Sequence, residues 1–153
     1  MRHRYLFTLE VTPVEVGKMY KKLPSHLTLM SRFFSDLSPV ELSKVTTPLF
    51  DQTRTIQLVF KETVELGPKK LAVHLLEQLD ESDQLHNALS NLLNSINVIY
   101  EYPEFIGKNY KPHVTMRDGV QFDVHDKHAI HYAYLVEIIE GQRVVQAKFR
   151  LTA

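Results

Sequence analysis

Apolar and polar residues alternate near both ends of the chain, and this period of two predicts β-strands there. The run Tyr5–Val11 alternates well enough for a first strand, and Ser25–Met30 reads as a second. Toward the C-terminus, the alternation over Ala129–Leu151 is interrupted at Glu140-Gly141-Gln142. A glycine-containing break between two alternating runs predicts a β-hairpin.

Two helices are indicated by their start signals and a third by its apolar spacing. Thr12-Pro13-Val14-Glu15 and Ser38-Pro39-Val40-Glu41 each offer an N-cap, a proline and a capping glutamate. They predict a helix over about Pro13–Lys22 and a second one that Pro48 should end. The third helix begins near Ser82, where apolar residues follow at spacings of 0, 3, 4, 7, 8 and 11.

Between and after the helices, the pattern predicts more strands and one long loop. Leu71–Leu76 fits either a strand or a helix, but its shortness and the preceding turn signal favour a strand. Tyr102–Asn109 reads as a loop that could overhang a site. The other expected strands are Arg54–Leu66, Val98–Tyr100 and Lys111–Arg117. This order of elements predicts two mixed lobes of strands and helices.

Composition narrows the class of protein. A chain of 153 residues with 44% hydrophobic content suits a single domain, 1–153, made of two interleaved lobes. Eighteen basic and eighteen acidic residues cancel, which argues against a protein that coats long nucleic acid. Cysteine is absent, so disulfides and thiolate chemistry are excluded, and a reducing compartment is favoured. With no apolar run of membrane-spanning length, we expect a soluble, cytoplasmic, monomeric protein.

Two tetrapeptides share one pattern: His26-Leu27-Thr28-Leu29 and His113-Val114-Thr115-Met116, with 87 positions separating the histidines. On a strand, residues i and i+2 share a face, so each copy points an imidazole and a hydroxyl the same way. If the strands lie side by side, two proton-transfer groups and two hydrogen-bond donors surround one small anionic centre. A phosphodiester is the obvious candidate for that centre.

Strand parity adds candidate anion contacts around the motifs. Lys111 and Arg117 have the parity of His113 and Thr115, and Arg32 has the parity of the first motif. These cations are candidates for phosphate binding. They also fit ordinary solvent-facing charges, and a β-bulge would change the parity.

The paired motifs resemble those of the two-histidine phosphoesterase superfamily, which includes 2′-5′ RNA ligase-like proteins and RNA cyclic phosphodiesterases. That family is marked by two H-x-[ST]-x motifs with apolar x, and both copies here fit. The stretch Tyr110–Arg117 is similar to the family's proline-preceded second motif. The resemblance implies an α+β, bilobal, pseudo-symmetric fold. Two mostly antiparallel sheets would carry helices on the outside, with the active-site groove between the lobes.

The resemblance also implies a metal-independent phosphodiesterase acting on 2′,3′-cyclic phosphate or 2′-5′ linked RNA or nucleotides. Its partner would be a short RNA end or a small nucleotide, with no cofactor and no metal. In the family the N-terminal histidine is often treated as the acid and the C-terminal one as the base. The implied catalytic residues are His26, Thr28, His113 and Thr115. The candidate substrate-binding residues are Lys111, Arg117, Arg32 and Tyr110.

Other interpretations stay open at this stage. The same residues would serve 2′-5′ RNA end-joining, and a catalytically silent RNA or nucleotide binder could share the fold. His125, His128 and His131 invite a metal-dependent hydrolase, although they read better as surface histidines. His86 reads as structural or exposed. Four aromatic residues suit either stacking on a base or burial in the protein core: Tyr5, Phe7, Tyr132 and Tyr134.

Overall fold

The computed structural model describes residues 2–66, 71–76, 80–115 and 122–153 of the chain. Within these residues the fold is rich in strands, with two α-helices and two short 3₁₀ turns. In chain order the elements are β1 (His3–Glu10), β2 (Met19–Tyr20), β3 (His26–Ser35), α1 (Pro39–Asp51), β4 (Ile56–Leu66), β5 (Leu71–Leu76), α2 (Asp80–Ser95), β6 (Ile99–Tyr100), η1 (Pro103–Phe105), η2 (Gly107–Asn109), β7 (His113–Thr115), β8 (Lys127–Ile130), β9 (Tyr132–Ile139) and β10 (Gln142–Arg150).

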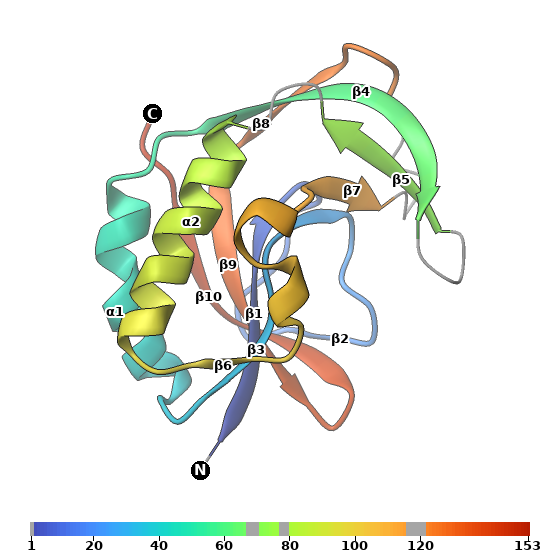
Figure 1. Cartoon of the computed structure of the whole chain (residues 1–153). Helices are drawn as coiled ribbons and strands as arrows, with labels where there is room; N and C mark the ends of the chain where they lie inside the picture. Colours follow the sequence, from blue (N-terminus) through green and yellow to red (C-terminus); the bar gives the residue numbers. More distant parts are fainter. Residues whose placement is uncertain (1, 67–70, 77–79, 116–121) are drawn as a thin grey trace.

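The strands follow the order β2-β10-β9-β1-β3-β7-β5-β4-β8, and β6 pairs with the far end of β3. Adjacent strands along this path run antiparallel. The path has two halves, which meet where β3 pairs with β7, and the β4–β5 hairpin curls away from the rest (Figure 1). The α+β fold class expected from the sequence is confirmed.

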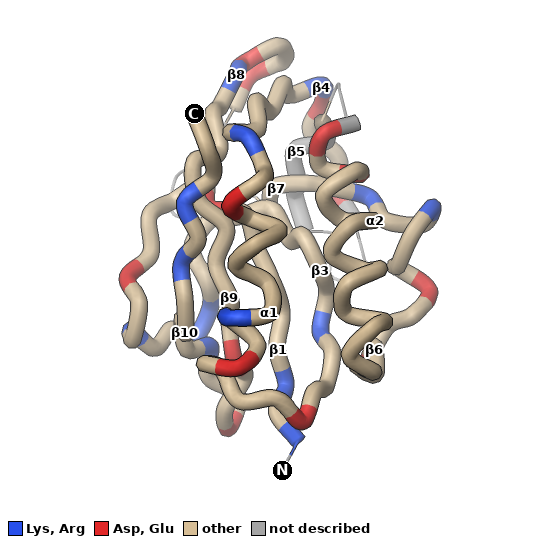
Figure 2. The backbone as a smooth tube through the Cα atoms, turned by 90° about the vertical axis from the view of Figure 1, so that its left-hand side faces the viewer, with Lys and Arg blue, Asp and Glu red and all other residues tan. Residues whose placement is uncertain are grey.

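Both helices cover the same face of the N-terminal half of the sheet. α1 packs on β10 and β9, α2 packs on β3, and the helices contact each other. Figure 2, which looks at the helix side, shows them in front of the central strands. The apolar stripe predicted in the third helix is buried here through Leu85, Leu89 and Leu93. The helices therefore leave the opposite face of the sheet available for a site.

The main core lies between the helices and the sheet and contains a cluster of phenylalanines. The ring centroids of Phe7 and Phe33 are 5.9 Å apart, and those of Phe50 and Phe149 are 4.6 Å apart. A smaller core on the other face contains Tyr134. Because Tyr5, Phe7 and Tyr134 are fully buried, these three aromatic residues pack in the interior and offer no face to a base.

The prediction of a helix over Pro13–Lys22 is wrong, because the structure has turns there followed by β2. The Glu10 carboxylate accepts the Val14 backbone N–H, and Gly17 adopts φ +88°, which a helix does not allow. The next residues pair with the open edge of β10, through Gly17 N to Val145 O at 2.7 Å. The hydrogen bonds that this segment makes to the open edge of β10 decide its structure over the local helix-capping signal.

The capping signal at Ser38 is confirmed, but Pro48 does not end the helix. Ser38 and Glu41 exchange the two hydrogen bonds of a capping box, and α1 continues through Pro48 to Asp51. An internal proline costs about 3 kcal/mol. Burying Phe50 beyond it contributes about 1.5–3 kcal/mol, and its stacking on Phe149 adds about 0.5–1.5 kcal/mol. Packing of the last turn thus offsets the proline.

We expect the substitution Pro48→Ala to raise the free energy of unfolding by about 1–2 kcal/mol. Alanine restores an N–H for the Lys44 carbonyl and removes the ring's crowding, and this gain exceeds the added entropy of the unfolded chain. Urea denaturation of both proteins measures the change. A lower unfolding midpoint for the variant would contradict this account of α1.

Of the other element predictions, the loop expected over Tyr102–Asn109 contains the two short 3₁₀ turns η1 and η2. The strand expected over Lys111–Arg117 is seen as β7, and its last two residues lie outside the described part of the chain. The strand at Leu71–Leu76 and the C-terminal hairpin of β9 and β10, which turns at Glu140-Gly141, are confirmed. The third helix begins at Asp80, two residues before the expected cap. Among the helices that the structure describes, none is both long and apolar enough to cross a membrane.

Candidate active site

The two His-x-Thr motifs lie on adjacent strands, β3 and β7, at the junction of the two halves of the sheet. Leu27 pairs with Val114 in antiparallel register. That register sets His26 opposite Thr115 and Thr28 opposite His113. The strands meet in the middle of both motifs, and the pairing has a local two-fold symmetry.

All four polar side chains of the motifs point to the same face of the sheet. Leu27 and Val114 are fully buried on the helix side. Because side chains alternate along a strand, the residues on either side of each point to the opposite face. Their exposure agrees, since His26, Thr28, His113 and Thr115 are each partly exposed.

The register arranges the four side chains as the corners of a rectangle. Directly opposite residues on antiparallel strands have Cβ atoms about 4.5–5.5 Å apart, and diagonal ones about 7–8 Å. Each histidine therefore has a threonine of the other strand as its near neighbour. The two histidines occupy one diagonal, and the two threonines occupy the other.

Both imidazoles are anchored in the same way. His26 Nδ1 lies 2.8 Å from the Pro24 carbonyl oxygen, and His113 Nδ1 lies 2.9 Å from the Lys111 carbonyl oxygen. A carbonyl oxygen only accepts, so each Nδ1–H donates to the carbonyl two residues earlier. This fixes the ring orientation and leaves proton transfer to Nε2 of each histidine.

Two further hydrogen bonds hold the motif strands in place. Ser25, which is buried, donates from Oγ to the Thr115 carbonyl oxygen at 3.4 Å and so links the start of β3 to β7. The Tyr110 hydroxyl donates to the Thr28 carbonyl oxygen at 2.8 Å. Burial, with the nearby Asp83 carboxylate, raises the pKa of Tyr110 well above its usual range, so it stays a donor. Tyr110, a substrate-binding candidate from the sequence, thus contacts the backbone of the first motif through its hydroxyl.

A cleft of about 300 Å³ opens beside the first motif. Its lining comes from β3 and β1, from the segment before β3, from Arg143 of β10 and from Tyr102. The described residues lining it include two guanidinium groups and no carboxylate, which favours a negatively charged occupant. They are Leu6, Leu23, His26, Thr28, Ser31, Arg32, Tyr102 and Arg143.

Arg32 reaches the cleft as its parity predicts, even though β3 is irregular. The pairing of β1 with β3 shifts register on either side of Phe7, and each shift inserts one extra residue into β3. Because two insertions restore a period of two, Arg32 returns to the face of His26 and Thr28. Its Nη1 lies 3.5 Å from Glu101, whose pKa is lowered mainly by a hydrogen bond from Arg4.

Lys111 and Arg117 are the other substrate-binding candidates from the sequence. The Lys111 side chain is exposed, and the residue supplies its carbonyl to His113. Arg117 lies outside the described residues. Arg143 and Tyr102 line the cleft but were not found by sequence reasoning. Tyr102 begins the loop expected to overhang a site, whereas no local pattern relates Arg143 to either motif.

His86 is a buried histidine that supports elements of the site without lining the cleft. It is 1% exposed, its Nδ1 donates to the Leu29 carbonyl oxygen at 2.7 Å, and its Nε2 accepts the Gly107 N–H at 3.0 Å. Its ring stacks on Tyr110 with centroids 3.8 Å apart. Gly107 has φ +76°, a conformation that suits glycine. His86 thus connects α2, β3 and the loop that carries Tyr110.

No cluster of three or more His, Cys, Asp or Glu side chains suited to a metal ion occurs within the described part of the chain. His125 is exposed in a turn with φ +69°, and His128 is half-buried in β8. Burial lowers the pKa of His128, with the neighbouring His131 adding to the effect.

The fold and the facing His-x-Thr strands define a protein of the two-histidine phosphoesterase type. The family model for the 2′-5′ RNA ligase superfamily matches residues 8–153, and the chain belongs to this superfamily. No curated protein matches the chain in sequence.

Several solved structures are similar to this fold. One described as a phosphoesterase has a TM-score of 0.65 at 15% identity, covering 100% of both chains. Escherichia coli LigT complexed with 3′-AMP has a TM-score of 0.63 at 15% identity, also with 100% of both chains covered. The protein TT0787 of Thermus thermophilus has a TM-score of 0.57 at 18% identity, with 97% of each chain covered.

Proposed function

We propose that this protein hydrolyses 2′,3′-cyclic phosphates at RNA ends or on nucleotides, without a metal ion, by paired histidine acid and base catalysis. The observation that carries the proposal is the Leu27–Val114 pairing, which brings both motifs onto one face. His26, Thr28, His113 and Thr115 are the proposed catalytic residues. Arg32 is proposed to bind the phosphate, and membership in the superfamily supports phosphoesterase chemistry.

The diagonal arrangement suits the geometry of phosphoryl transfer. The attacking and leaving oxygens lie roughly in line on opposite sides of phosphorus. Histidines on one diagonal approach a central phosphate from opposite sides, so one imidazole serves each oxygen. The threonine hydroxyls on the other diagonal donate to the non-bridging oxygens as negative charge increases there.

The position of the cleft supports the assignment of acid and base. The cleft lies beside His26 and holds the nucleoside part of the substrate, so the departing ribose oxygen lies on that side. His113 Nε2 accepts a proton from water while the water oxygen bonds to phosphorus. The bond from phosphorus to one ribose oxygen breaks, and His26 Nε2–H gives that oxygen a proton.

Similar proteins support a nucleotide as the substrate. LigT structures exist as complexes with 3′-AMP, NADP⁺ and ATP. Lys111 and Arg117 are kept as proposed contacts to the phosphate or to the following nucleotide, because both have the parity of His113. Tyr110 is proposed as a positioning residue for Thr28. End-joining of 2′-5′ linkages is the same chemistry in reverse.

A substrate panel assayed with and without a chelator tests the proposal. The panel contains 2′,3′-cyclic AMP, an oligoribonucleotide ending in a 2′,3′-cyclic phosphate, and a 2′-5′ linked dinucleotide. We expect turnover of the cyclic phosphates at an unchanged rate in excess EDTA, with a single phosphomonoester product identified by chromatography. Loss of activity in EDTA that returns with a divalent cation would exclude the metal-independent mechanism. Activity on the 2′-5′ linked dinucleotide alone would contradict the proposed cyclic phosphate substrate and assign the 2′-5′ linkage instead.

A further inference from the structure

A second cleft, of about 330 Å³, continues from the candidate active site along the same face of the protein. Arg143 lines both clefts, so the two are neighbours across this one side chain. The second cleft lies between the segment before β3 and the tip of the β9–β10 hairpin. Its lining residues are Lys21, Lys22, Glu140, Gly141, Gln142 and Arg143.

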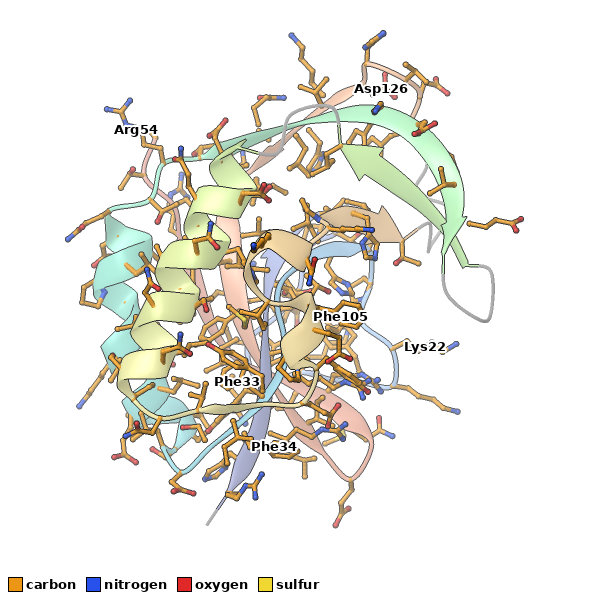
Figure 3. The ribbon with its side chains drawn as sticks, viewed as in Figure 1. Lys22, Phe33, Phe34, Arg54, Phe105 and Asp126 are labelled. Carbon is orange, nitrogen blue, oxygen red and sulfur yellow. The ribbon has the colours of Figure 1, made fainter. Side chains whose placement is uncertain are left out.

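The two clefts concentrate positive charge in a chain whose net charge is zero. Their combined lining carries the cations Lys21, Lys22, Arg32 and Arg143, against a single carboxylate, that of Glu140. Lys21 and Lys22 are exposed, and in Figure 3 Lys22 extends outward on the side away from the helices. A row of cations leading out of a site favours a ligand with repeating negative charge.

The arrangement at the middle of this row is fixed before any ligand binds. Arg143 Nη1 donates to the Lys21 carbonyl oxygen at 2.9 Å and to the Gly141 carbonyl oxygen at 3.0 Å. Next to it, β10 pairs with β2 through Arg143 and Tyr20. The guanidinium therefore ties the backbone of the lysine-bearing segment to the hairpin tip, so Lys21 and Lys22 start from a fixed place beside Arg143.

We infer that Lys21, Lys22 and Arg143 form a backbone-binding track for single-stranded RNA, whose 3′-terminal cyclic phosphate lies at His26 and His113. The phosphates on the 5′ side of the terminal nucleotide lie along the track. This inference rests on the proposed function and narrows its substrate class, because an oligonucleotide extends to Lys21 and Lys22, which line only the second cleft, and a mononucleotide in the first cleft does not.

The test compares the double variant Lys21→Glu/Lys22→Glu with a matched control, Lys44→Glu/Arg54→Glu. The control makes the same charge change at exposed positions outside both clefts, on α1 and before β4 (Figure 3 labels Arg54). Arg143 is left intact because it holds the hairpin. For each protein, kcat/KM is measured on 2′,3′-cyclic AMP and on an oligoribonucleotide ending in a 2′,3′-cyclic phosphate, at several salt concentrations.

We expect the double variant to lose about tenfold in kcat/KM on the oligonucleotide and to keep its rate on 2′,3′-cyclic AMP. The salt dependence on the oligonucleotide also becomes shallower, by about 0.7 in logarithmic slope for each phosphate that the variant no longer binds. Equal effects on both substrates, or no effect on the oligonucleotide, would overturn the track while leaving the proposed function intact.

A binding measurement separates failure of the track from failure of the proposed function. If the unmodified protein hydrolyses neither substrate, the proposed function fails, and fluorescence anisotropy with a labelled single-stranded oligoribonucleotide then decides the inference. Weaker, less salt-dependent binding by Lys21→Glu/Lys22→Glu than by the control variant supports the track. Equal binding by the two variants overturns it.

Discussion

Replacing either His26 or His113 by asparagine is expected to lower kcat for 2′,3′-cyclic AMP by about 10²–10⁴-fold. Each variant loses the Nε2 atom that moves a proton. The asparagine amide can still donate to the carbonyl of Pro24 or Lys111, so the strand ends stay anchored. The free energy of unfolding should therefore change little, because both side chains are partly exposed. Steady-state kinetics and urea denaturation measure the two effects separately.

The pH profiles of these variants assign the acid and the base. With both histidines present, the rate falls at low pH as the base becomes protonated and at high pH as the acid loses its proton. If His113 is the base, His113→Asn removes the fall on the acidic side. If His26 is the acid, His26→Asn removes the fall on the alkaline side. If His26→Asn instead removes the fall on the acidic side and His113→Asn the fall on the alkaline side, His26 is the base and His113 is the acid.

A matched control and the double variant show whether the two histidines act together. His131→Asn alters an exposed histidine between β8 and β9 and should leave kcat unchanged. Residues that act as a unit have strongly non-additive effects, so the double variant should be little slower than either single variant. A parent-like rate in either His26→Asn or His113→Asn would refute the proposed mechanism.

The sequence predicts the parts of this fold that depend on local signals. The Ser38 capping box, the apolar stripe of α2 and the alternation of the C-terminal hairpin each act within a few residues, and the structure has all three. Strand period also placed His26 and Thr28 on one face. Local chemistry and final structure agree wherever no distant partner competes.

The predictions that fail are those that a distant partner decides. The segment after Thr12 has a helix signal but pairs with Val145, far along the chain. Pro48 stays inside α1 because Phe149 packs on Phe50 from another element. Arg143 lies 117 positions after His26, so only the folding of β10 beside β2 brings it to the cleft. Single-sequence patterns contain no signal for such pairings.

Replacing His86 by leucine is expected to lower the free energy of unfolding by about 2–4 kcal/mol. Leucine leaves the Leu29 carbonyl and the Gly107 N–H without their present partner, and each buried unpaired group costs about 1–3 kcal/mol. The loss is a large part of a typical stability of about 5–15 kcal/mol. Thermal unfolding should show a melting temperature lower by about 5–15 °C.

Activity should fall in the same variant, although His86 does not line the cleft. Its ring supports Tyr110, whose hydroxyl holds the Thr28 carbonyl oxygen. Tyr110→Phe is the matched control, because it keeps the stacked ring and removes only the hydroxyl. It should cost about 1 kcal/mol of stability. A larger loss of activity for Tyr110→Phe than for His86→Leu would assign the anchoring of Thr28 to the hydroxyl alone.

The dependence of stability on pH gives an independent test of His86. Burial lowers the pKa of His86 below its ordinary value of 6.5, with the Leu29 hydrogen bond and Asp83 opposing the shift. Below about pH 6.5 the unfolded chain takes up a proton that the folded protein excludes, so stability falls as the pH is lowered toward the folded-state pKa. His128 acts in the same direction and remains in the variant. The free energy of unfolding of His86→Leu should therefore fall less steeply between pH 6.5 and pH 5 than that of the parent. Identical slopes for the two proteins would show that His86 is protonated equally in the folded and unfolded states.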